Sequence, residues 1–368
     1  MHDYRLIDTS DVPSPTLLVY PEVIRANLQR AVKAAGGPER LRPHAKTHKT
    51  REIARLGLDL GITKHKCATL AEAEMLAQAG AADVLIAYPL VGPNLRRLAD
   101  LVEAHPKSRF AVTADDANVV RELANAVVAK RQSVDVLLDL DVGQHRTGMP
   151  ICDAALDLYG SFANLPGLRP GGLHVYDGHN RQPNRSERAA AVEEMLGPVR
   201  GFRAELERRR LPVPRLVLGG TPTFPVHAAL PDVGVECSPG TFVLHDHGYS
   251  ARYPDLPGFE PAAVLLTRVI SRPTPTRVTL DLGTKAVASD PPAGQRVHLL
   301  DFPPFEAVAH NEEHFVVETV GAASYKPGDV VYALPAHICP TVALYPRLQT
   351  VEGGRITGAW AVASRDRV

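Results

Sequence analysis

The sequence has no excess of charge of either sign, because 41 Lys and Arg residues balance 41 Asp and Glu residues. Proteins that bind nucleic acid or an anionic membrane surface need a basic excess. We therefore expect no nucleic-acid and no membrane partner. The chain also lacks any apolar run near the ~20 residues that cross a bilayer, and its polar start does not resemble a signal peptide. Together these absences predict a cytoplasmic protein that acts on a small molecule.

Cysteine is scarce as well, with four widely separated residues: Cys67, Cys152, Cys237 and Cys339. Their spacing shows none of the pairing expected of a disulfide framework, and this favours a reduced compartment. A turn of the form Gly-x-Gly-x-x-Gly after the first strand, the signature of dinucleotide binding, is also lacking.

From residue 41 to about residue 240 the chain alternates between extended and helical patterns. The helical patterns are Leu70–Ala79, Asn94–Ala104, Ala117–Lys130 and Ser186–Arg210. The extended runs are Leu41–Lys46, Gly61–Lys66, Asp83–Ala87, Arg109–Thr113, Val134–Leu140, Gly172–Tyr176, Arg215–Leu218 and Gly234–Cys237. About eight such repeats predict an α/β fold, a (β/α)8 barrel of the TIM type. An open doubly wound sheet is the alternative, which the lack of a dinucleotide turn disfavours.

The rest of the chain has a different rhythm. A Pro- and Gly-rich stretch over residues 249–261 is typical of a linker. Short β-type runs then predict a smaller C-terminal all-β domain: Ala263–Ile270, Arg277–Asp281, Val297–Leu300, His314–Val320, Val330–Leu334, Thr341–Tyr345 and a tail around Trp360. We therefore expect a lead-in over residues 1–20, which can add a strand to the β domain, a barrel over residues 21–248 and a β domain over residues 249–368.

The stretch Leu-Arg-Pro-His-Ala-Lys-Thr-His-Lys-Thr, at the end of the first extended run, crowds three cations and two imidazoles together. Like charges at such density repel each other unless an anion lies among them. One interpretation is a solvated basic turn. The other is a lysine that forms a Schiff base with a phosphorylated aldehyde cofactor, with its pKa lowered by Arg42, His44 and His48. Lys46 and Lys49 fall on different faces, so only one of them is expected to point into a pocket.

Reactive residue types recur where the predicted strands end, and a barrel carries its active site at that face. They include His65, Lys66, Asp139, Asp141, Arg146, His174, Tyr176 and His179. The last two strands end in the glycine turns Gly219–Thr223 and Ser238–Thr241, a type of turn that binds phosphate through backbone N–H groups. Each turn alone is weak support. A lysine and a phosphate anchor are the minimum for holding pyridoxal phosphate.

In the predicted β domain, His337 and Cys339 lie two residues apart. On an extended strand they would share a face and could hold one cation, and a thiolate–imidazole pair favours a soft or borderline metal such as zinc. The alternative is a half-buried cysteine beside an ordinary histidine.

Taken together, these residues resemble the D-threonine aldolase / D-serine dehydratase group of fold-type III pyridoxal-phosphate enzymes, which are relatives of alanine racemase. The resemblance covers nearly the whole chain. Its motifs are Arg42–Lys49, Asp141–Gly148, Tyr176–His179, Gly219–Thr223, Glu236–Thr241, Asn311–His314 and His337–Cys339.

The resemblance implies a barrel and a β domain that pair head-to-tail in a homodimer, so that the β domain of one subunit completes the site of the other. It also implies a role for individual residues. Lys46 would be the Schiff-base lysine, Arg146 would lie near the phenolic oxygen of the cofactor, and Tyr176 would lie by its pyridine ring. Gly220, Thr221, Gly240 and Thr241 would hold the phosphate, and His337 with Cys339 would hold a divalent metal.

Two departures from alanine racemases argue against two-base racemisation. Those enzymes have an arginine facing the pyridine nitrogen, where this chain has Cys237 and Ser238. They also use a tyrosine of the β domain as the second base, where this chain reads Asp281-Leu-Gly-Thr-Lys285.

The expected substrate is a D-configured β-hydroxy-α-amino acid of the D-serine and D-threonine class, and two lyase reactions compete. If Lys46 removes the α-proton and the hydroxyl leaves, the products are a 2-oxo acid and ammonia. If another base, such as His179, takes the hydroxyl proton, the Cα–Cβ bond breaks and the products are glycine and an aldehyde.

In the family a Cys at the second metal position accompanies zinc dehydratases, and an Asp accompanies aldolases that use harder cations. Cys339 therefore favours elimination and zinc over manganese or magnesium. A non-catalytic protein that binds pyridoxal phosphate is a third reading, which the presence of a β domain disfavours.

Overall fold

The computed structural model describes residues 2–367, which form two compact units. One, named here the barrel unit, comprises Ala31–Lys46, Arg51–Gly240 and the last residues of the chain. The other, named the sheet unit, comprises the chain up to Arg30 together with Thr47–Thr50 and Thr241–Arg365. Within residues 2–367, no helix combines the length and the apolar composition that crossing a bilayer requires.

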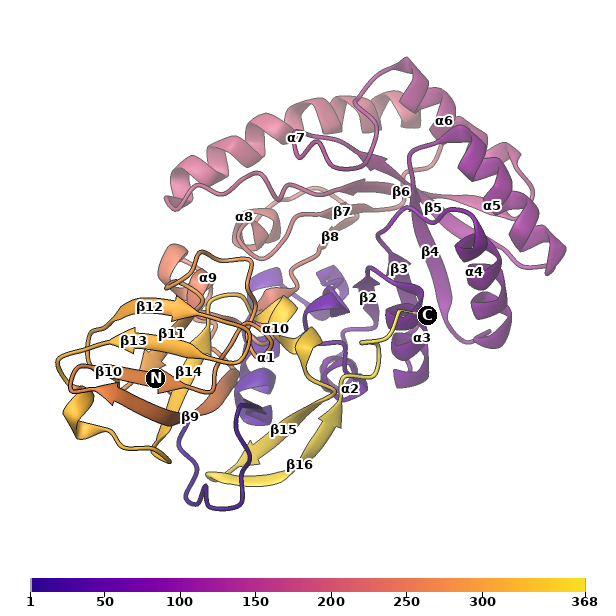
Figure 1. Ribbon diagram of the computed structural model, residues 1–368. Helices are drawn as coiled ribbons and strands as arrows, with labels where there is room; N and C mark the ends of the chain where they lie inside the picture. Colours follow the sequence, from indigo (N-terminus) through magenta and orange to yellow (C-terminus); the bar gives the residue numbers. More distant parts are fainter. Residues whose placement is uncertain (1, 368) are drawn as a thin grey trace. The chain divides into compact units, whose positions relative to one another are not determined.

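The barrel unit is built on a seven-stranded parallel sheet with strands in sequence order (Figure 1). Its strands are β2 (Lys64–Cys67), β3 (Asp83–Ile86), β4 (Arg109–Ala114), β5 (Val134–Leu140), β6 (Leu168–Val175), β7 (Leu216–Leu218) and β8 (Val235–Cys237). Buried side chains of four of these strands form an apolar cluster of Leu85, Ala111, Leu137 and Val217. These buried side chains and the parallel strand order are typical of a curved sheet that encloses one apolar core.

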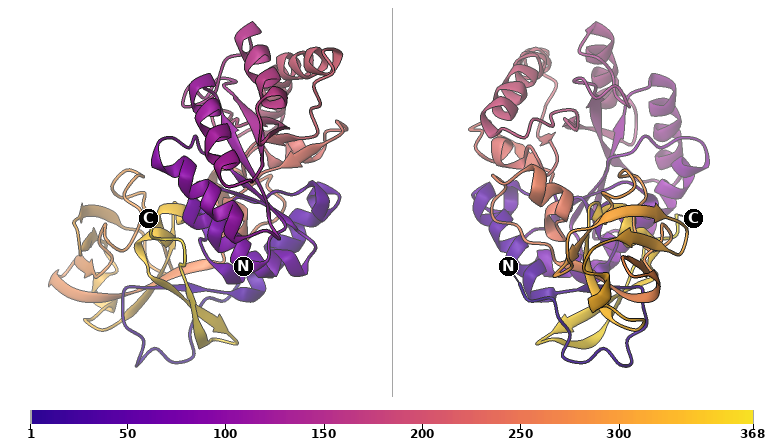
Figure 2. Two further views of the ribbon diagram at one scale, coloured as in Figure 1. Left: turned by 90° about the vertical axis from the view of Figure 1, so that its right-hand side faces the viewer. Right: turned by 60° about the vertical axis from the view of Figure 1, so that its left-hand side comes forward.

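Helices follow the strands and cover the outer side of the sheet (Figures 1 and 2). They are α2 (Arg51–Asp59), α3 (Leu70–Ala79), α4 (Pro93–Ala104), α5 (Ala117–Ala129), α6 (Asp153–Asn164), α7 (Arg185–Arg208) and α8 (Phe224–Ala228). Side-chain caps set several of the helix starts. Thr69 accepts a hydrogen bond from the Glu72 amide at α3, and Asp116 accepts bonds from the first amides of α5. The helix α1 (Pro21–Ala35) begins with a proline, which suits that position because its missing N–H is not needed there.

The predicted first strand, residues 41–46, is not a regular strand. Leu41 bridges to Cys237 of β8 and His44 bridges to Lys66 of β2, and a 3₁₀ turn, η2 (Ala45–Thr47), follows. Pro43 explains the short pairing, because it has no N–H to donate to a ladder. The segment still connects the two edge strands of the sheet, β2 and β8, and occupies the position of an eighth strand. The predicted fold class, a β/α barrel with a smaller all-β part, is confirmed.

A layer of buried charges lies at the amino ends of the barrel strands. Arg42 Nε donates to Glu236 at 2.5 Å and Arg42 Nη1 donates to Asp83 at 2.7 Å. Arg215 pairs with Asp83 and with Asp135. Every charge in this layer therefore has an opposite charge beside it, as buried ions require.

The sheet unit contains one nine-stranded sheet. Its order is β12-β13-β10-β9-β1-β15-β16, and β14 pairs with both β9 and β11. The strands are β1 (Thr16–Val19), β9 (Ala263–Thr274), β10 (Arg277–Leu280), β11 (Val297–Leu300), β12 (Glu306–His310), β13 (Phe315–Glu318), β14 (Val330–Pro335), β15 (Arg347–Glu352) and β16 (Arg355–Ala361). The N-terminal β1 pairs antiparallel with β9 and parallel with β15, so the lead-in supplies a central strand of this sheet.

Two expectations for the sheet unit were wrong. The run Thr341–Tyr345 is not a strand but belongs to the helix α10 (Ile338–Leu344), and the stretch taken as a linker includes part of the helix α9 (His247–Arg252). Thr341 explains the first error, because its hydroxyl bonds back to the His337 carbonyl and accepts the Ala288 amide, which satisfies it within a helix.

Candidate active site

The carboxyl ends of the barrel strands bring together several of the side chains that the sequence marked as reactive. His65 is not one of them, because its ring lies against the Ile62 carbonyl. Lys46 lies on η2, which follows the bridge at His44, and it is exposed. Its backbone N–H donates to His44 Nδ1 at 3.2 Å, so this ring nitrogen acts as an acceptor. The side chain of Lys49, the alternative lysine, is buried, and its residue belongs to the sheet unit.

Arg42 is paired with carboxylates in the structure. Its guanidinium is fully buried among Glu236 and Asp83 at the other end of the strands. Burial alone would lower the pKa of Arg42, but these two carboxylates raise it. Arg42 therefore has its carboxylate partners in this layer, and its suggested effect on Lys46 stays a prediction.

Lys66 is the cation that the barrel places near Lys46. It is the last residue but one of β2, has 2% of its surface exposed, and its ammonium lies 5.9 Å from the centre of the Tyr176 ring. Burial, followed by the positive charge of Lys46, lowers the pKa of Lys66 to about 7. The sequence analysis placed Lys66 at a strand end but assigned it no role. The available signal was a lysine at a position of a barrel strand where a buried apolar residue is expected.

Tyr176 follows β6 and has a second cation near its ring. The guanidinium carbon of Arg146 lies 4.8 Å from the ring centre, a cation–π distance. Arg146 is on the loop after β5, where Gly143 has a φ of 121° and a Cβ would come 3.0 Å from His179 Nε2. A glycine is therefore needed at position 143 for the His179 ring to pack against this loop.

A buried pair, Asp139 and His174, lies beside this cluster. His174 Nδ1 is 2.6 Å from Asp139 Oδ1, and Asp139 also accepts the Thr147 hydroxyl at 2.9 Å. Burial lowers the pKa of His174 despite the carboxylate. His174 Nε2 is buried and has no hydrogen-bond partner among the described residues. Asp141 and His145, by contrast, form an ion pair at 2.8 Å in which His145 is solvent-exposed.

The two glycine turns lie side by side at the ends of β7 and β8. The Gly240 amide donates to Thr221 Oγ1 at 3.1 Å, and the Gly220 amide donates to Thr223 Oγ1 at 3.3 Å. Gly219 has a φ of 71°, and a Cβ there would come 2.4 Å from the His227 ring, so only glycine fits. Thr241, the next residue, belongs to the sheet unit, where its hydroxyl lies 3.4 Å from Cys339 Sγ.

Asp177 fastens the first of these turns. It pairs with His227 at 2.7 Å and accepts the Thr223 hydroxyl at 3.0 Å. Both partners belong to the β7 turn and the helix α8 that follows it. The position of the turn is therefore set by a buried carboxylate and not by the glycines alone.

In the sheet unit, His337 caps α10 and Cys339 lies in its first turn, so the two are not on a strand as predicted. They nevertheless interact. Burial would lower the pKa of His337, but hydrogen bonds to Cys339 and Asp290 raise it to about 9. Burial would raise the pKa of Cys339, but the His337 contact lowers it. His337 Nδ1 lies 2.6 Å from Asp290, which leaves Nε2 as the nitrogen for a metal.

Two further contacts fix the thiol and the helix. Cys339 Sγ lies 3.2 Å from the Thr47 hydroxyl, within the sheet unit. Asp246 accepts the amides of Tyr249 and Ile338, so it holds the first turn of α10 in place. Within residues 2–367, no group of three or more His, Cys, Asp or Glu side chains is arranged to hold a metal ion. The pair therefore supplies two candidate ligands.

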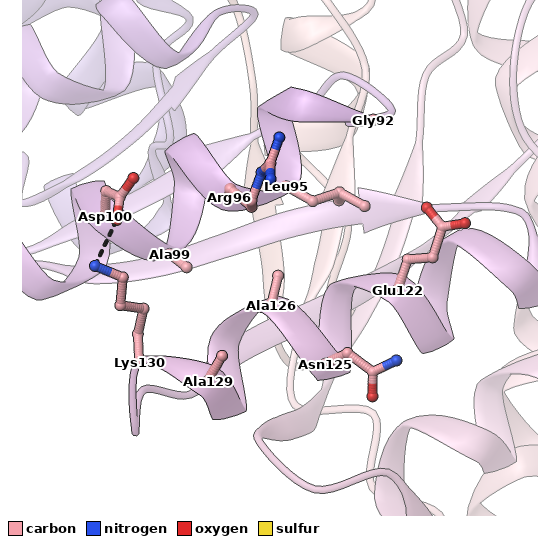
Figure 3. A pocket seen from close by; sticks show the side chains of 10 residues that line it. All are labelled: Gly92, Leu95, Arg96, Ala99, Asp100, Glu122, Asn125, Ala126, Ala129 and Lys130. Carbon is pink, nitrogen blue, oxygen red and sulfur yellow. Dashed lines mark ion pairs between the residues drawn. The ribbon is translucent and has the colours of Figure 1, made fainter.

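A groove on the outer surface of the barrel unit lies apart from these residues. It runs between α4 and α5 and is lined by Ala99, Ala126 and Ala129, among others, and Lys130 pairs with Asp100 at 2.8 Å beside it (Figure 3). None of the predicted site residues lines this groove.

Comparison with known proteins matches both parts of the chain. Residues 19–244 match the family model described as "Alanine racemase, N-terminal domain", and residues 262–351 match the "Putative serine dehydratase domain". A D-threonine aldolase of Arthrobacter sp is 32% identical over 363 residues, covering 96% of this chain and 93% of that protein. The chain belongs to the D-threonine aldolase / D-serine dehydratase family.

Other members of this family support the same assignment. A D-threo-3-hydroxyaspartate dehydratase of Delftia sp. is 26% identical, covering 91% of this chain and 92% of that protein. The crystal structure of a D-threonine aldolase from Filomicrobium marinum superposes with a TM-score of 0.90 at 29% identity, covering 100% of both chains. The fold is therefore alanine-racemase-like, and the chain is an enzyme of the pyridoxal-phosphate-dependent lyase type.

The residues of the barrel unit fit the cofactor that the family implies. The His174 Nε2 atom, which is buried without a hydrogen-bond partner among the described residues, is suited to contact a bound polar group. Lys46 supplies an amine, Arg146 and Lys66 supply positive charge around Tyr176, and the adjoining turns at Gly220 and Gly240 supply a phosphate site.

Proposed function

We propose that this enzyme is a divalent-metal-dependent lyase that converts D-β-hydroxy-α-amino acids of the D-serine and D-threonine class into a 2-oxo acid and ammonia. The observation that carries this proposal is the contact between His337 and Cys339, in which the imidazole lowers the pKa of the thiol. A thiolate suits zinc better than manganese or magnesium. The family resemblance associates a cysteine at the second metal position with dehydratases.

Pyridoxal phosphate, when bound, withdraws electrons from the Cα of an amino acid joined to it. Lys46 would hold the aldehyde carbon covalently until the substrate amine displaces it. The freed amine of Lys46 would then take the proton from Cα. Arg146 would face the phenolic oxygen and Tyr176 the pyridine ring. The phosphate would be held by Gly220, Thr221, Gly240 and Thr241.

The metal would be held by His337 Nε2 and Cys339 Sγ and would act as a Lewis acid on the β-hydroxyl. Asp290, bonded to His337 Nδ1, would orient the ring and increase its basicity, as carboxylates commonly do beside metal-binding histidines. Because the protein supplies two ligands, coordination positions remain for water and substrate. These residues would therefore help the hydroxyl to leave.

Retro-aldol cleavage to glycine and an aldehyde is the second candidate, and a specific observation favours it. The relative that is 32% identical over 96% of the chain is a D-threonine aldolase. In this reaction His179 would take the proton of the β-hydroxyl. Its Nδ1 is buried without a hydrogen-bond partner among the described residues, so the ring is not tied to another protein group through that nitrogen.

Product analysis with D-threonine separates the two reactions. Elimination gives 2-oxobutanoate and ammonia, and cleavage gives glycine and acetaldehyde. L-threonine and the Lys46→Ala variant are the controls, and neither should give product. Cleavage products alone would replace the first proposal with the second. If neither pair of products forms from D-serine or D-threonine, both proposals are contradicted.

The metal is tested separately with Cys339→Ala. This variant should lose bound metal and turnover while it keeps the visible absorbance of the bound cofactor. Cys152→Ala, at an exposed cysteine, is the matched control and should keep both. Unchanged turnover after exhaustive chelation would remove the metal from the mechanism.

We further propose that the enzyme is a cytoplasmic homodimer. None of the four cysteines forms a disulfide, as expected in a reducing compartment, and the family resemblance implies the pairing of two subunits. Sedimentation should give twice the chain mass of 39.7 kDa. A species of the chain mass alone would contradict the dimer.

A further inference from the structure

Lys66 is held rigidly at its place in the barrel. Its amide donates to the Pro43 carbonyl at 2.8 Å, and its Cα is paired in register with Leu85 of β3 and with His44. The side chain is buried, with 2% of the residue exposed. The backbone of Lys66 is therefore fixed by the two neighbouring segments, and its side chain is buried.

Among the described residues, the Lys66 ammonium lies near the Tyr176 ring, and the two carboxylates that affect its charge, Asp177 and Asp139, do so without a hydrogen bond to it. Both carboxylates are already engaged. Asp139 bonds to His174 and to Thr147, and Asp177 bonds to His227 and the Thr223 hydroxyl. A buried cation without a partner is costly unless a ligand supplies the missing negative charge.

The groups that face Lys66 come from every element around it. They are Lys46 on the segment of residues 41–46, Asp139 on β5, His174 on β6, Asp177 after β6, Arg146 and the Tyr176 ring, and Arg42 on the same segment adds a weaker influence of its charge. Two of the nearer cations, Lys46 and Arg146, add to the positive potential. An anionic oxygen that enters this cluster is therefore favoured, and it would draw a proton onto Lys66.

We propose that Lys66 binds an anionic oxygen of the bound cofactor or of the bound amino acid, beside the amine of Lys46. This inference rests on the proposed function. Two oxygens have the right chemistry, the phenolate of the cofactor and the carboxylate of the substrate. Lys66 is a binding and positioning residue in this proposal, and Lys46 remains the covalent attachment point.

The experiment compares wild type, Lys66→Met and Lys66→Arg, with Lys130→Met as a control for the same substitution on the outer surface. Each protein is loaded with pyridoxal phosphate, and its visible absorbance is titrated with pH. 2-Aminoisobutyrate, which has neither an α-proton nor a β-hydroxyl and so undergoes neither candidate reaction, is then added as a carboxylate probe and its affinity is measured. Borohydride reduction and peptide mapping report which lysine carries the cofactor.

If Lys66 binds the phenolate, Lys66→Met shifts the absorbance transition upward by at least about 1 pH unit, because the anion loses its cation. If it binds the carboxylate, the transition stays in place and affinity for the probe falls at least about tenfold. Lys66→Arg should recover most of either effect, and Lys130→Met should show none.

Wild-type values for both measurements in Lys66→Met would overturn the proposal while leaving the proposed function intact. Attachment of the cofactor to Lys66 itself would also overturn it. A wild-type protein that binds no pyridoxal phosphate would overturn the proposed function and this inference with it. Thermal unfolding of each variant shows that a negative result does not come from misfolding.

Discussion

The two ends of the barrel differ in how their buried cations are paired. At the amino ends of the strands, Arg42 lies within 2.7 Å of two carboxylates, Glu236 and Asp83, although its Nη2 is buried without a hydrogen-bond partner among the described residues. At the carboxyl ends, Lys66 has nearby carboxylates but no hydrogen bond to them, and His174 has a ring nitrogen without a hydrogen-bond partner among the described residues. Satisfied charges hold a structure together, whereas unsatisfied ones are tolerated where a ligand completes them. The difference marks the carboxyl end as the site.

The largest expected effect is at the carboxyl end. Lys46→Ala should abolish the visible absorbance of the bound cofactor and reduce turnover at least about a thousandfold, because both attachment and proton transfer need this amine. Absorbance after soaking in pyridoxal phosphate, followed by a turnover assay, measures both. Lys49→Ala is the control and should behave like wild type. The opposite pattern would move the attachment point to Lys49.

Arg42→Met tests the amino end. It leaves Glu236 and Asp83 buried without their cation, so the free energy of unfolding should fall by about 3–5 kcal/mol. Denaturant titration measures this loss. The cofactor absorbance of the folded variant should be unchanged, since Arg42 lies at the other end of the strands. A spectral change without loss of stability would contradict the division between the two ends.

Removal of the Lys66 charge at the carboxyl end should increase stability, whereas removal of the Arg42 charge at the amino end should decrease it. Burial lowers the pKa of Lys66 to about 7, so between the unfolded value near 10.5 and pH 7 the unfolded chain binds more protons than the folded one. Stability of the unliganded wild type therefore falls as the pH drops through this range. Lys66→Met should raise the melting temperature at pH 7, and the difference should vanish above about pH 10.5. A lower melting temperature at pH 7 would mean that Lys66 has a partner in the folded protein.

The smallest effect is the acid response of the amino-end layer. Burial opposes ionisation of Glu236 and Asp83, but Arg42 lowers the pKa of both carboxyls. Their contribution to stability is present above the unfolded values near 4 and is lost as the pH falls through the lower folded values. Arg42→Met should therefore flatten the pH dependence of stability below about pH 4. If the stability of the variant fell equally steeply below about pH 4, other carboxyl groups would be responsible for the acid transition.

Much of the barrel was predictable, because strands of a parallel sheet separated by amphipathic helices leave a periodic pattern. The extended run Val134–Leu140 and the helix Leu70–Ala79 have the predicted bounds. The placement of Arg42 was not predictable from its closeness to Lys46 in sequence. Four residues of extended chain span about 13 Å. Arg42 and Lys46, which belong to one sequence motif, can therefore lie at opposite ends of the barrel.

The site was predictable in its residue types but not in its pairings. Lys66 was seen as a polar strand end, yet only the fold shows that Asp139 and Asp177 are engaged elsewhere and make no hydrogen bond to it. His337 and Cys339 were paired by a strand rule that does not apply to a helix start. Such details depend on contacts between residues far apart in the chain, which local patterns do not carry.

The central claim is that one lysine at the carboxyl end of the barrel holds pyridoxal phosphate covalently, and peptide mapping after borohydride reduction of the loaded protein tests it most directly. The account predicts a single modified peptide with the cofactor on Lys46. Modification of Lys49 or Lys66 instead, or no modification at all, would contradict it.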